Sequence, residues 1–388
     1  TGGTVRALIN ALRDGRRART RALAIGMFLL CTLLAGVQAY ADQVTPSERV
    51  KTRLRIRAAP TTESPIIGSL EPGETAPLRR SLSHWYEVTT PDGRPGFVSK
   101  AWARLIPDSP LAARELRLGA WNIRKLGHGS SKDFNAVASV IEAHFDIVAV
   151  IEVMQRAGGH PGYDALIAHL GPAWRGLITD TPRPNTSSGS AEFYAILYRS
   201  DRLRTWDDLP ALVYHPDHDG SPTGAGHDRF SREPAFGCFV AIREDGSDGF
   251  DFMLAAYHAR WADGDILDIQ SEVEHLEEVF RSMQAVRPNE RDLLIIGDFN
   301  LRPPDLENAL GRPIDTIGTG STLNSNGAIT DNLYDHLVIA DLASTSERIG
   351  PATVLDVRSV AADPRTFFRT VSDHLPILAR FRVEVDDD

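Results

Sequence analysis

The feature that most constrains the fold of this chain is an apolar run at residues 293–296 that ends abruptly in Gly297, Asp298, Phe299 and Asn300. Four consecutive apolar residues bounded by a glycine predict a buried β-strand that stops at Gly297. Such a strand would place Asp298 and Asn300 at one edge of a sheet, which is where α/β folds carry their chemistry. Because an Asp-x-Asn sequence after a strand is also typical of a simple turn, the other strand ends decide between a turn and a functional site.

Strand-like apolar runs recur from residue 116 onward and outnumber the helical patterns. The runs cover residues 116–121, 147–151, 194–198, 236–242, 252–257, 293–296, 337–339 and 377–381. Apolar residues with helical spacing occur at 134–141 and, as one longer stripe that predicts a single helix, at 266–283. Many strands with few helices favour an α/β four-layer sandwich, in which two mixed β-sheets pack face to face and helices flank them.

The N-terminal residues 1–41 have the pattern of a secretory signal peptide. Six arginines precede an apolar segment at 22–37, which is followed by Ala39-Tyr40-Ala41. An uncleaved membrane anchor is the alternative, but the apolar segment is shorter than the roughly 20 residues that a spanning helix needs. We therefore expect cleavage after Ala41, no stable membrane span afterwards, and a bacterial protein exported to the periplasm or the extracellular space.

Removal of residues 1–41 changes both charge and cysteine content. The whole chain carries a formal charge of −10, and residues 1–41 hold six Arg and one Asp, so the remainder carries −15. Cys238 is then the one remaining cysteine, which excludes an internal disulfide. Its place in an apolar run predicts that Cys238 packs in the core as a small apolar side chain.

Residues 49–107 form a separate basic segment with closely spaced turn signals, which predicts a small all-β barrel. The order LRIR, IIGSL, WYEV and GFV resembles the bacterial SH3-like family, whose members commonly bind peptides or cell-wall material. The resemblance implies such a ligand here, whereas a spacer barrel without a ligand is the alternative. The segment has ten Lys and Arg against five Asp and Glu, and residues 108 onward carry −18. Residues 108–115 read as a linker.

Acids, amides and histidines follow several of the predicted strands. The residues are Asn122, Glu152, His258, Asp298, Asn300, Asp335, Asp373 and His374. Carboxylate and amide oxygens suit a hard divalent cation, and histidines transfer protons near neutral pH. This combination suits phosphodiester hydrolysis, in which the negative charge around phosphorus must be offset and water, a poor nucleophile, must be activated. The absence of a G-x-S-x-G elbow and of an HExxH motif argues against a serine nucleophile and against zinc.

Residues 116–384 resemble the endonuclease/exonuclease/phosphatase superfamily, and most closely its deoxyribonuclease I-like branch. Eight segments follow the family order: LRLGAWNIRKLG, FDIVAVIEV, AEFYAILYR, FSREPA, LAAYHARW, IIGDFN, LYDHLVI and VSDHLPI. FSREPA and SDHLP are the most specific of these. The resemblance implies the four-layer fold and a metal-dependent hydrolase of phosphate esters.

The resemblance also implies a role for each matching residue. His258 and His374 would act as the acid/base pair, Glu192 and Asp335 would orient them, and Asp298 would position or activate water. The implied substrate contacts are Asn122, Arg232 and Asn300. The implied ligands of Mg²⁺ (or Mn²⁺) are Glu152, Asn122 and Asp373. The implied ligands of a structural Ca²⁺ are Asp219, Asp228 and Glu233.

Two departures from the nuclease pattern leave the substrate open. Met154 and Ser190 occupy places where the nuclease has an arginine and a tyrosine that contact DNA. An exported Mg²⁺-dependent endonuclease acting on DNA is the leading hypothesis. A phospholipid or small phosphodiester hydrolase of the sphingomyelinase-like kind is the alternative on the same fold. A catalytically silent protein that binds the cell envelope is the alternative from a different class.

Overall fold

A computed structural model describes most of the chain after residue 42. The described residues are 43–47, 49–82, 84–106, 115–129, 131–184, 191–216, 229–261, 265–341 and 345–386. The predicted signal peptide at 1–41 lies outside them, and Asp42–Asp388 forms one compact unit. Among these described residues, none of the helices is both long and apolar enough to cross a membrane.

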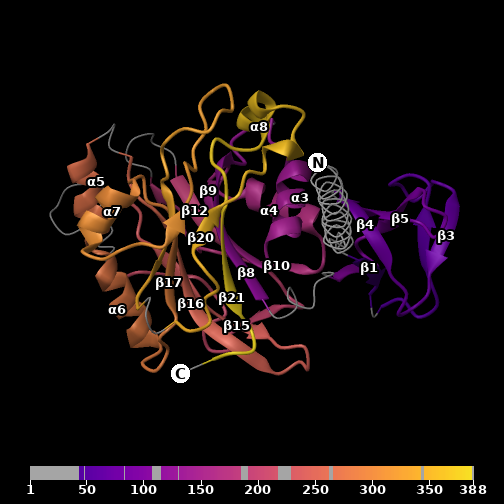
Figure 1. The fold of residues 1–388 in the computed structure, drawn as a ribbon, viewed down its shortest axis with the longest axis horizontal. Coiled ribbons are helices and arrows are strands. Elements are labelled where there is room, and N and C mark those ends of the chain that lie inside the picture. Colours follow the sequence, from indigo (N-terminus) through magenta and orange to yellow (C-terminus); the bar gives the residue numbers. More distant parts are fainter. Residues whose placement is uncertain are drawn as a thin grey trace, which may run out of the picture. The chain divides into compact units, whose positions relative to one another are not determined.

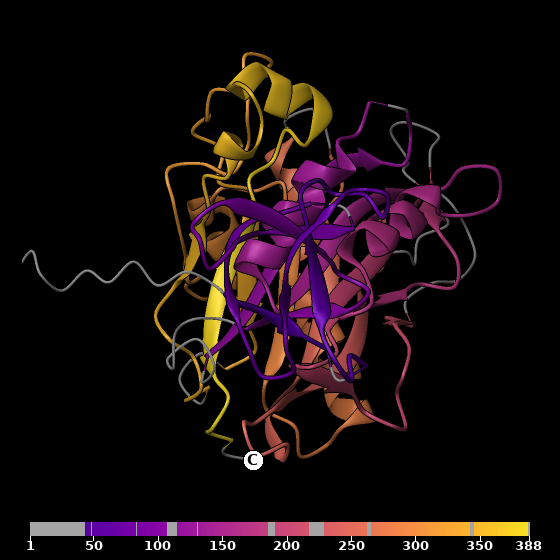
Figure 2. The same cartoon turned by 90° about the vertical axis from the view of Figure 1, so that its right-hand side faces the viewer.

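A small all-β region comes first and is antiparallel throughout the part that the structure describes (Figure 2). Its strands are β1 (Gln43–Pro46), β2 (Leu54–Arg57), β3 (Ile66–Leu70), β4 (Ala76–Ser81), β5 (Trp85–Thr89), β6 (Pro95–Ser99) and β7 (Ala103–Ile106), in the order β3-β2-β6-β5-β4-β1-β7. Buried and outward-facing residues alternate along β2 and β5, because successive side chains of a strand point to opposite faces. The predicted small barrel is confirmed.

Two further sheets follow and pack against each other (Figure 1). The first has the order β10-β12-β9-β8-β21-β20-β18, with strands β8 (Glu115–Leu126), β9 (Ile147–Met154), β10 (Trp174–Ile178), β11 (Arg183–Pro184, paired with β12), β12 (Ala191–Arg199), β18 (Thr316–Ile317), β20 (Ala352–Val354) and β21 (Ile377–Arg382). The second has the order β13-β15-β16-β17-β19, with strands β13 (Leu203–Thr205), β14 (Val213–Tyr214, paired with β15), β15 (Ala235–Ile242), β16 (Asp248–His258), β17 (Leu293–Asp298) and β19 (Asp335–Ile339).

The two-residue period of the strands builds three apolar layers. Leu116, Leu118 and Ala120 of β8 join the core between the sheets, whereas Trp121 and Ile123 of the same strand face the outer core. Helices α3 (Phe134–His144), α4 (Pro161–Leu170) and α8 (Pro364–Thr370) pack on that outer face, and a short 3₁₀ helix, η1 (Arg358–Val360), precedes α8. Helices α5 (Ile266–Val273), α6 (Leu276–Val286) and α7 (Pro303–Leu310) cover the second sheet. The predicted four-layer sandwich is confirmed.

The structure corrects two local predictions. The strand at 293–296 does not stop at Gly297 but continues through Asp298, because β17 stays paired with β16 and β19 to that point. The stripe at 266–283 forms two helices rather than one, because the chain tightens at the joint: the His275 backbone N–H bonds to Glu272, three residues back. All eight predicted strand runs fall within observed strands, and Cys238 is fully buried in the core.

Candidate active site

Strand register brings the first group of polar residues into one row. His258 ends β16 and lies opposite Asp298 at the end of parallel strand β17, and Asp298 lies opposite Asp335 at the start of antiparallel strand β19. Gly297 permits this close pairing, because its φ is +151° and an added Cβ would overlap the carbonyl oxygen of Tyr257. Gly297 was predicted to end the strand, but it is the residue that keeps β17 in register with its neighbours.

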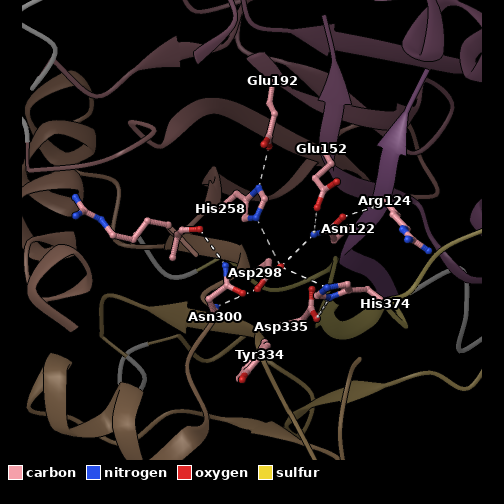
Figure 3. A network of polar contacts seen from close by, with 12 residues as sticks. Asn122, Arg124, Glu152, Glu192, His258, Asp298, Asn300, Tyr334, Asp335 and His374 are labelled. Atoms are coloured by element: carbon pink, nitrogen blue, oxygen red, sulfur yellow. Dashed lines mark hydrogen bonds and ion pairs between the residues drawn. The ribbon is translucent and has the colours of Figure 1, made fainter. Parts of the chain in front are cut away.

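The other sheet supplies the facing residues. Asn122 lies in β8, Glu152 in β9 and Glu192 near the start of β12, while His374 lies three residues before β21. Hydrogen bonds cross from one sheet to the other here, since the Asn122 amide donates to Asp298 Oδ2 (3.0 Å). The site thus lies where the ends of the two central sheets meet (Figure 3).

His258 is oriented by a buried carboxylate. Its Nδ1 lies 2.9 Å from Glu192 Oε2, and both side chains are nearly inaccessible to solvent. Because a carboxylate only accepts hydrogen bonds, Nδ1 carries the proton of this contact and Nε2 is directed into the site. Arg232 in turn donates to Glu192 Oε1 (3.2 Å), which holds the carboxylate in place.

His374 forms a second pair of the same kind. Its Nδ1 lies 2.8 Å from Asp335 Oδ2, and Asp335 is fully buried. Burial disfavours the charged imidazolium, but the nearby carboxylates of Asp335 and Asp298 outweigh it and raise the pKa of His374 well above its ordinary value. At neutral pH the His374 imidazole is therefore in its positively charged form.

The two histidine–carboxylate pairs converge on Asp298 (Figure 3). The distances from Asp298 Oδ2 are 3.8 Å to His258 Nε2 and 3.6 Å to His374 Nε2, longer than direct hydrogen bonds. Spacings of this size leave room for a bridging water or a substrate oxygen. Asp298 itself is fixed by the Asn300 backbone N–H, which donates to Oδ1 (3.0 Å), and by the Asn122 amide.

Glu152 offers carboxylate oxygens beside this convergence. Its Oε1 accepts from the Asn122 amide (3.1 Å) and its Oε2 from the Lys125 backbone N–H (2.8 Å), so each oxygen keeps a lone pair. The residue is only partly buried, and its φ of +60° is a strained conformation for a residue with a side chain. Strain of this kind is common where a side chain is held for function.

Asp373, the third predicted metal ligand, is also partly exposed and close to Glu152. Burial and the nearby Glu152 raise the pKa of Asp373, although His374 and Arg124 oppose the shift. Its Oδ2 lies 3.2 Å from Arg124 Nε. The oxygen-only donor set of Glu152 and Asp373 fits a hard divalent cation. Within the described residues, Asp298, Asp335 and His374 also bring potential ligand atoms within 4.8 Å of one another.

Two residues that the resemblance assigned to phosphate binding instead hold protein groups. Arg232 is 2% exposed and donates to Glu192 and to the carbonyl oxygens of His258 (3.0 Å) and Ala259 (2.6 Å). Asn300 is buried, and its amide donates to the same Ala259 carbonyl (3.0 Å). Burial and these contacts make both residues supports of the site in this structure, and their assignment to phosphate stays a prediction.

The predicted calcium site gains no support from the described residues. Asp219 and Asp228 lie outside them, as does Ser190. Glu233 is buried and its Oε2 lies 2.5 Å from Arg183 Nε. Because two of its three predicted ligands lie outside the described residues, the calcium site stays a prediction.

The structure adds residues that the sequence reasoning did not single out. Lys132 is partly buried, and its Nζ donates to the carbonyl oxygens of Ile123, Arg124 and Val371. Desolvation lowers the pKa of Lys132 to about 8. Ser372 donates to the Asn122 carbonyl (2.6 Å) and accepts from the His374 backbone N–H. Ser372 lies within the VSDHLPI segment, which is a usable signal, whereas nothing in the sequence marks Lys132.

Comparisons with known proteins agree with this geometry. The model of the endonuclease/exonuclease/phosphatase family matches residues 119–374, and the model of the bacterial SH3 domain matches residues 52–103. A curated protein named "Deoxyribonuclease" from Thioalkalivibrio sp. is 32% identical over 288 residues, which are 71% of this chain and 73% of that protein.

Solved structures are similar at lower identity. A conserved protein from Enterococcus faecalis has a TM-score of 0.48 at 14% identity and covers 69% of this chain and 100% of its own. An endonuclease/exonuclease/phosphatase from Bacteroides vulgatus has a TM-score of 0.46 at 18% identity and covers 70% of this chain and 99% of its own. From the family match and the curated relative, the chain belongs to the endonuclease/exonuclease/phosphatase family of phosphate-ester hydrolases, with a bacterial SH3-like domain ahead of its catalytic domain.

Proposed function

We propose that the protein is a divalent-metal-dependent endonuclease that hydrolyses phosphodiester bonds of DNA. The observation that carries the proposal is the convergence of the two histidine–carboxylate pairs on Asp298, with Nε2 of His258 and of His374 at 3.8 and 3.6 Å from one carboxylate oxygen. Two proton-transfer groups on either side of one acid are what an in-line attack of water on phosphorus needs.

The different environments of the two histidines suggest their roles. Nε2 of His258 faces Asp298, so together they accept the proton of the attacking water as its oxygen bonds to phosphorus. His374, which is protonated at neutral pH, donates to the ester oxygen as its bond to phosphorus breaks. Water thereby adds across the phosphodiester, giving a phosphate monoester and an alcohol, and each histidine returns to its starting state by exchange with solvent.

Glu152 and Asp373 would hold the cation, with Mg²⁺ (or Mn²⁺) as the proposed ion. When bound, a divalent cation supplies positive charge to the phosphate oxygens. The Asn122 amide donates to both Glu152 and Asp298, so it links the proposed cation site to the acid at the centre of the site. Asn122 acts here as a positioning residue.

DNA is proposed as the substrate because the curated relative at 32% identity carries the name "Deoxyribonuclease". The Met154 side chain is 2% exposed, so it is not placed to contact a substrate of either kind. A second candidate would be a lipid or small phosphodiester, and the following comparison separates the two.

A substrate panel tests the proposal. Supercoiled plasmid, a small chromogenic phosphodiester and sphingomyelin vesicles are each incubated with the protein in Mg²⁺ and in EDTA. The proposal predicts nicked plasmid in Mg²⁺ and none in EDTA, with intact vesicles. Release of the phosphorylated headgroup with plasmid left untouched would contradict DNA as the substrate while leaving the catalytic site in place.

We propose in addition that the protein is exported, on the strength of the basic, apolar and small-residue pattern of residues 1–41. A fusion of residues 1–60 to a reporter that is active only outside the cytoplasm tests this. Export predicts reporter activity, which should disappear when the six arginines and the apolar segment are deleted. An inactive fusion that accumulates in the cytoplasm would contradict the proposal.

A further inference from the structure

A basic groove of about 410 Å³ opens on the SH3-like barrel, in residues that the catalytic site does not use. Its cationic lining consists of Arg49, Lys51, Arg53, Arg55 and Arg57, and Trp85 and Trp102 add two aromatic rings. None of the described residues that line it is acidic. We call this feature the basic groove.

The strand period explains why the cations gather on one side. Leu54 and Ile56 of β2 are buried in the barrel core, so the odd-numbered neighbours project from the opposite face. Arg53 and Arg55 are exposed there, and within the described chain neither forms an ion pair. Arg57 is held by a hydrogen bond to the Ser64 carbonyl (2.7 Å) and forms a fixed end of the row.

Trp102 adds an exposed aromatic surface. The residue lies in the turn between β6 and β7, is 48% exposed, and is fixed by backbone hydrogen bonds with Ser99 (3.0 Å) and Ser47 (2.9 Å). The Arg49 guanidinium lies 5.5 Å from the centre of its ring. Trp102 therefore offers an exposed flat ring beside a cation.

These features select the chemistry of the ligand. A row of cations without acidic neighbours attracts a polyanion far more than an uncharged glycan or a neutral peptide. Among polyanions, single strands of nucleic acid combine phosphates spaced along a backbone with flat bases that stack on aromatic side chains. The groove offers both partners, cations in a row and an exposed indole.

We propose that the basic groove binds a single-stranded segment of nucleic acid, with Arg53 and Arg55 on phosphates and Trp102 stacked on a base. The inference rests on the proposed function in that the bound strand belongs to the substrate. It also accounts for the charge of the chain, because residues 108 onward carry −18 and repel a polyanion, whereas residues 49–107 have an excess of five positive charges.

Fluorescence anisotropy of a labelled 12-nucleotide DNA strand tests the inference. The protein carries His258→Ala and is held in EDTA, so binding is measured without cleavage. Arg53→Gln/Arg55→Gln should raise the dissociation constant about tenfold and reduce the slope of log Kd against log salt by about 1 to 1.5, since each lost single-strand phosphate contact contributes about 0.7. Trp102→Ala should weaken binding about tenfold.

The control is Arg79→Gln/Arg80→Gln, which removes two exposed cations of the same barrel that lie outside the groove and pair with Glu87. It should change the dissociation constant less than twofold, and the groove variants should hydrolyse a small phosphodiester as fast as the parent protein. If both double variants weakened binding of the DNA strand equally, net charge alone would explain the effect, and the inference would be overturned. Retention on purified cell-wall sacculi that depends on Arg53 and Arg55, with no binding of the strand, would also overturn it. Because binding is measured with an inactive protein, failure of the nuclease proposal would not imitate either result.

Discussion

At the scale of single residues, the central feature is that each histidine is defined by its carboxylate partner. Glu192 fixes the proton on His258 Nδ1, and Asp335 holds His374 in its charged form. Glu192 acts through His258, and Asp335 acts through His374 while also bringing a carboxylate oxygen within 4.8 Å of Asp298. Replacing a carboxylate that works in this way should cost no further rate once its histidine has been removed.

His258→Ala should lower kcat by about 10²- to 10⁴-fold, the usual contribution of a general base. Glu192→Gln should cause a smaller loss by itself, and the double variant should be no slower than His258→Ala, because Glu192 has nothing left to orient. The test compares single-turnover rates of the parent protein, both single variants and the double variant on a small phosphodiester. Thermal unfolding of each variant checks that it is folded. Losses that multiply would show that Glu192 acts independently of His258.

Glu152→Gln should raise the Mg²⁺ concentration for half-maximal activity by roughly tenfold or more, because a neutral amide binds a hard cation more weakly than a carboxylate. The thermal stabilisation that Mg²⁺ gives the parent protein should also shrink. Glu244→Gln, an exposed acid in the turn between β15 and β16, serves as the control. An unchanged Mg²⁺ dependence in both assays would remove Glu152 from the cation site.

The sequence predicted most of these residues but not all of their contacts. Asn122, Glu152, His258 and Asp298 each follow a local apolar run and were therefore predictable, although β8 and β9 continue past Asn122 and Glu152. The burial of Arg232 and Asn300 depends on how separate strands meet, and a motif does not carry that information. The motif therefore did not predict that both side chains donate to carbonyl and carboxylate groups of the protein.

At the scale of elements, the site depends on strand register, and Gly297 is the residue that sets it. Gly297→Ala should destabilise the fold by about 1–3 kcal/mol, because the new methyl group overlaps the Tyr257 carbonyl and must push β16 away from β17. It should also slow hydrolysis by up to about 10²-fold, since His258 and Asp298 end those strands. Urea unfolding and kcat measure the two effects.

Gly159→Ala is the matched control, because a Cβ at that position meets no atom within 4 Å and its φ is not in the left-handed region. It should leave stability and rate close to those of the parent protein. If Gly297→Ala behaved like Gly159→Ala, the close approach of β16 and β17 would not be what aligns the site.

Asp146, just before β9, ties several elements together and predicts a pH dependence of stability. Burial alone would raise its pKa, but Arg117, Arg202 and Arg199 together lower it to about 2. Because the folded pKa is below the ordinary value of 3.8, the stabilisation is complete above about pH 4 and is lost as pH falls toward 2. The shift corresponds to on the order of 2 kcal/mol.

Urea unfolding of the parent protein and of Asp146→Asn at pH 7 and pH 3 measures this. The difference in free energy of unfolding should be large at pH 7 and should narrow at pH 3. Asp248→Asn removes an exposed acid that pairs with Arg204 and should change stability little at either pH. A difference that stays constant between the two pH values would show that Asp146 stabilises the fold by packing rather than by charge.

Strands and helices were predictable here where short stretches of sequence determine them. All eight apolar runs became strands, because short apolar runs bounded by turn signals are typical of strands in a sheet protein. The break at His275 was not predictable, since Ile269, Val273 and Leu276 keep a helical spacing through it. The long reach of β17 through Gly297 likewise depends on its neighbours and not on its own sequence.

At the scale of the whole molecule, the two segments of the chain carry opposite net charge. The barrel segment is basic and the catalytic part strongly acidic, and the sequence showed that division directly. It did not show the buried ion pair of Lys100 and Glu142 (2.6 Å), which are 42 residues apart and 3% and 4% exposed. Burial raises the pKa of Glu142 to about 7 and lowers the pKa of Lys100. The charge of each residue opposes the shift of the other, so each stabilises the charged form of its partner.

The most direct test of the account is the nicking of supercoiled plasmid by the parent protein and by His258→Ala and His374→Ala in Mg²⁺ at pH 7. The account predicts conversion of supercoiled to open-circular DNA by the parent protein, no conversion in EDTA, and rates at least 10²-fold lower for each histidine variant, with unchanged thermal unfolding. Plasmid that stays supercoiled with the parent protein, or variants that nick as fast as the parent, would contradict it.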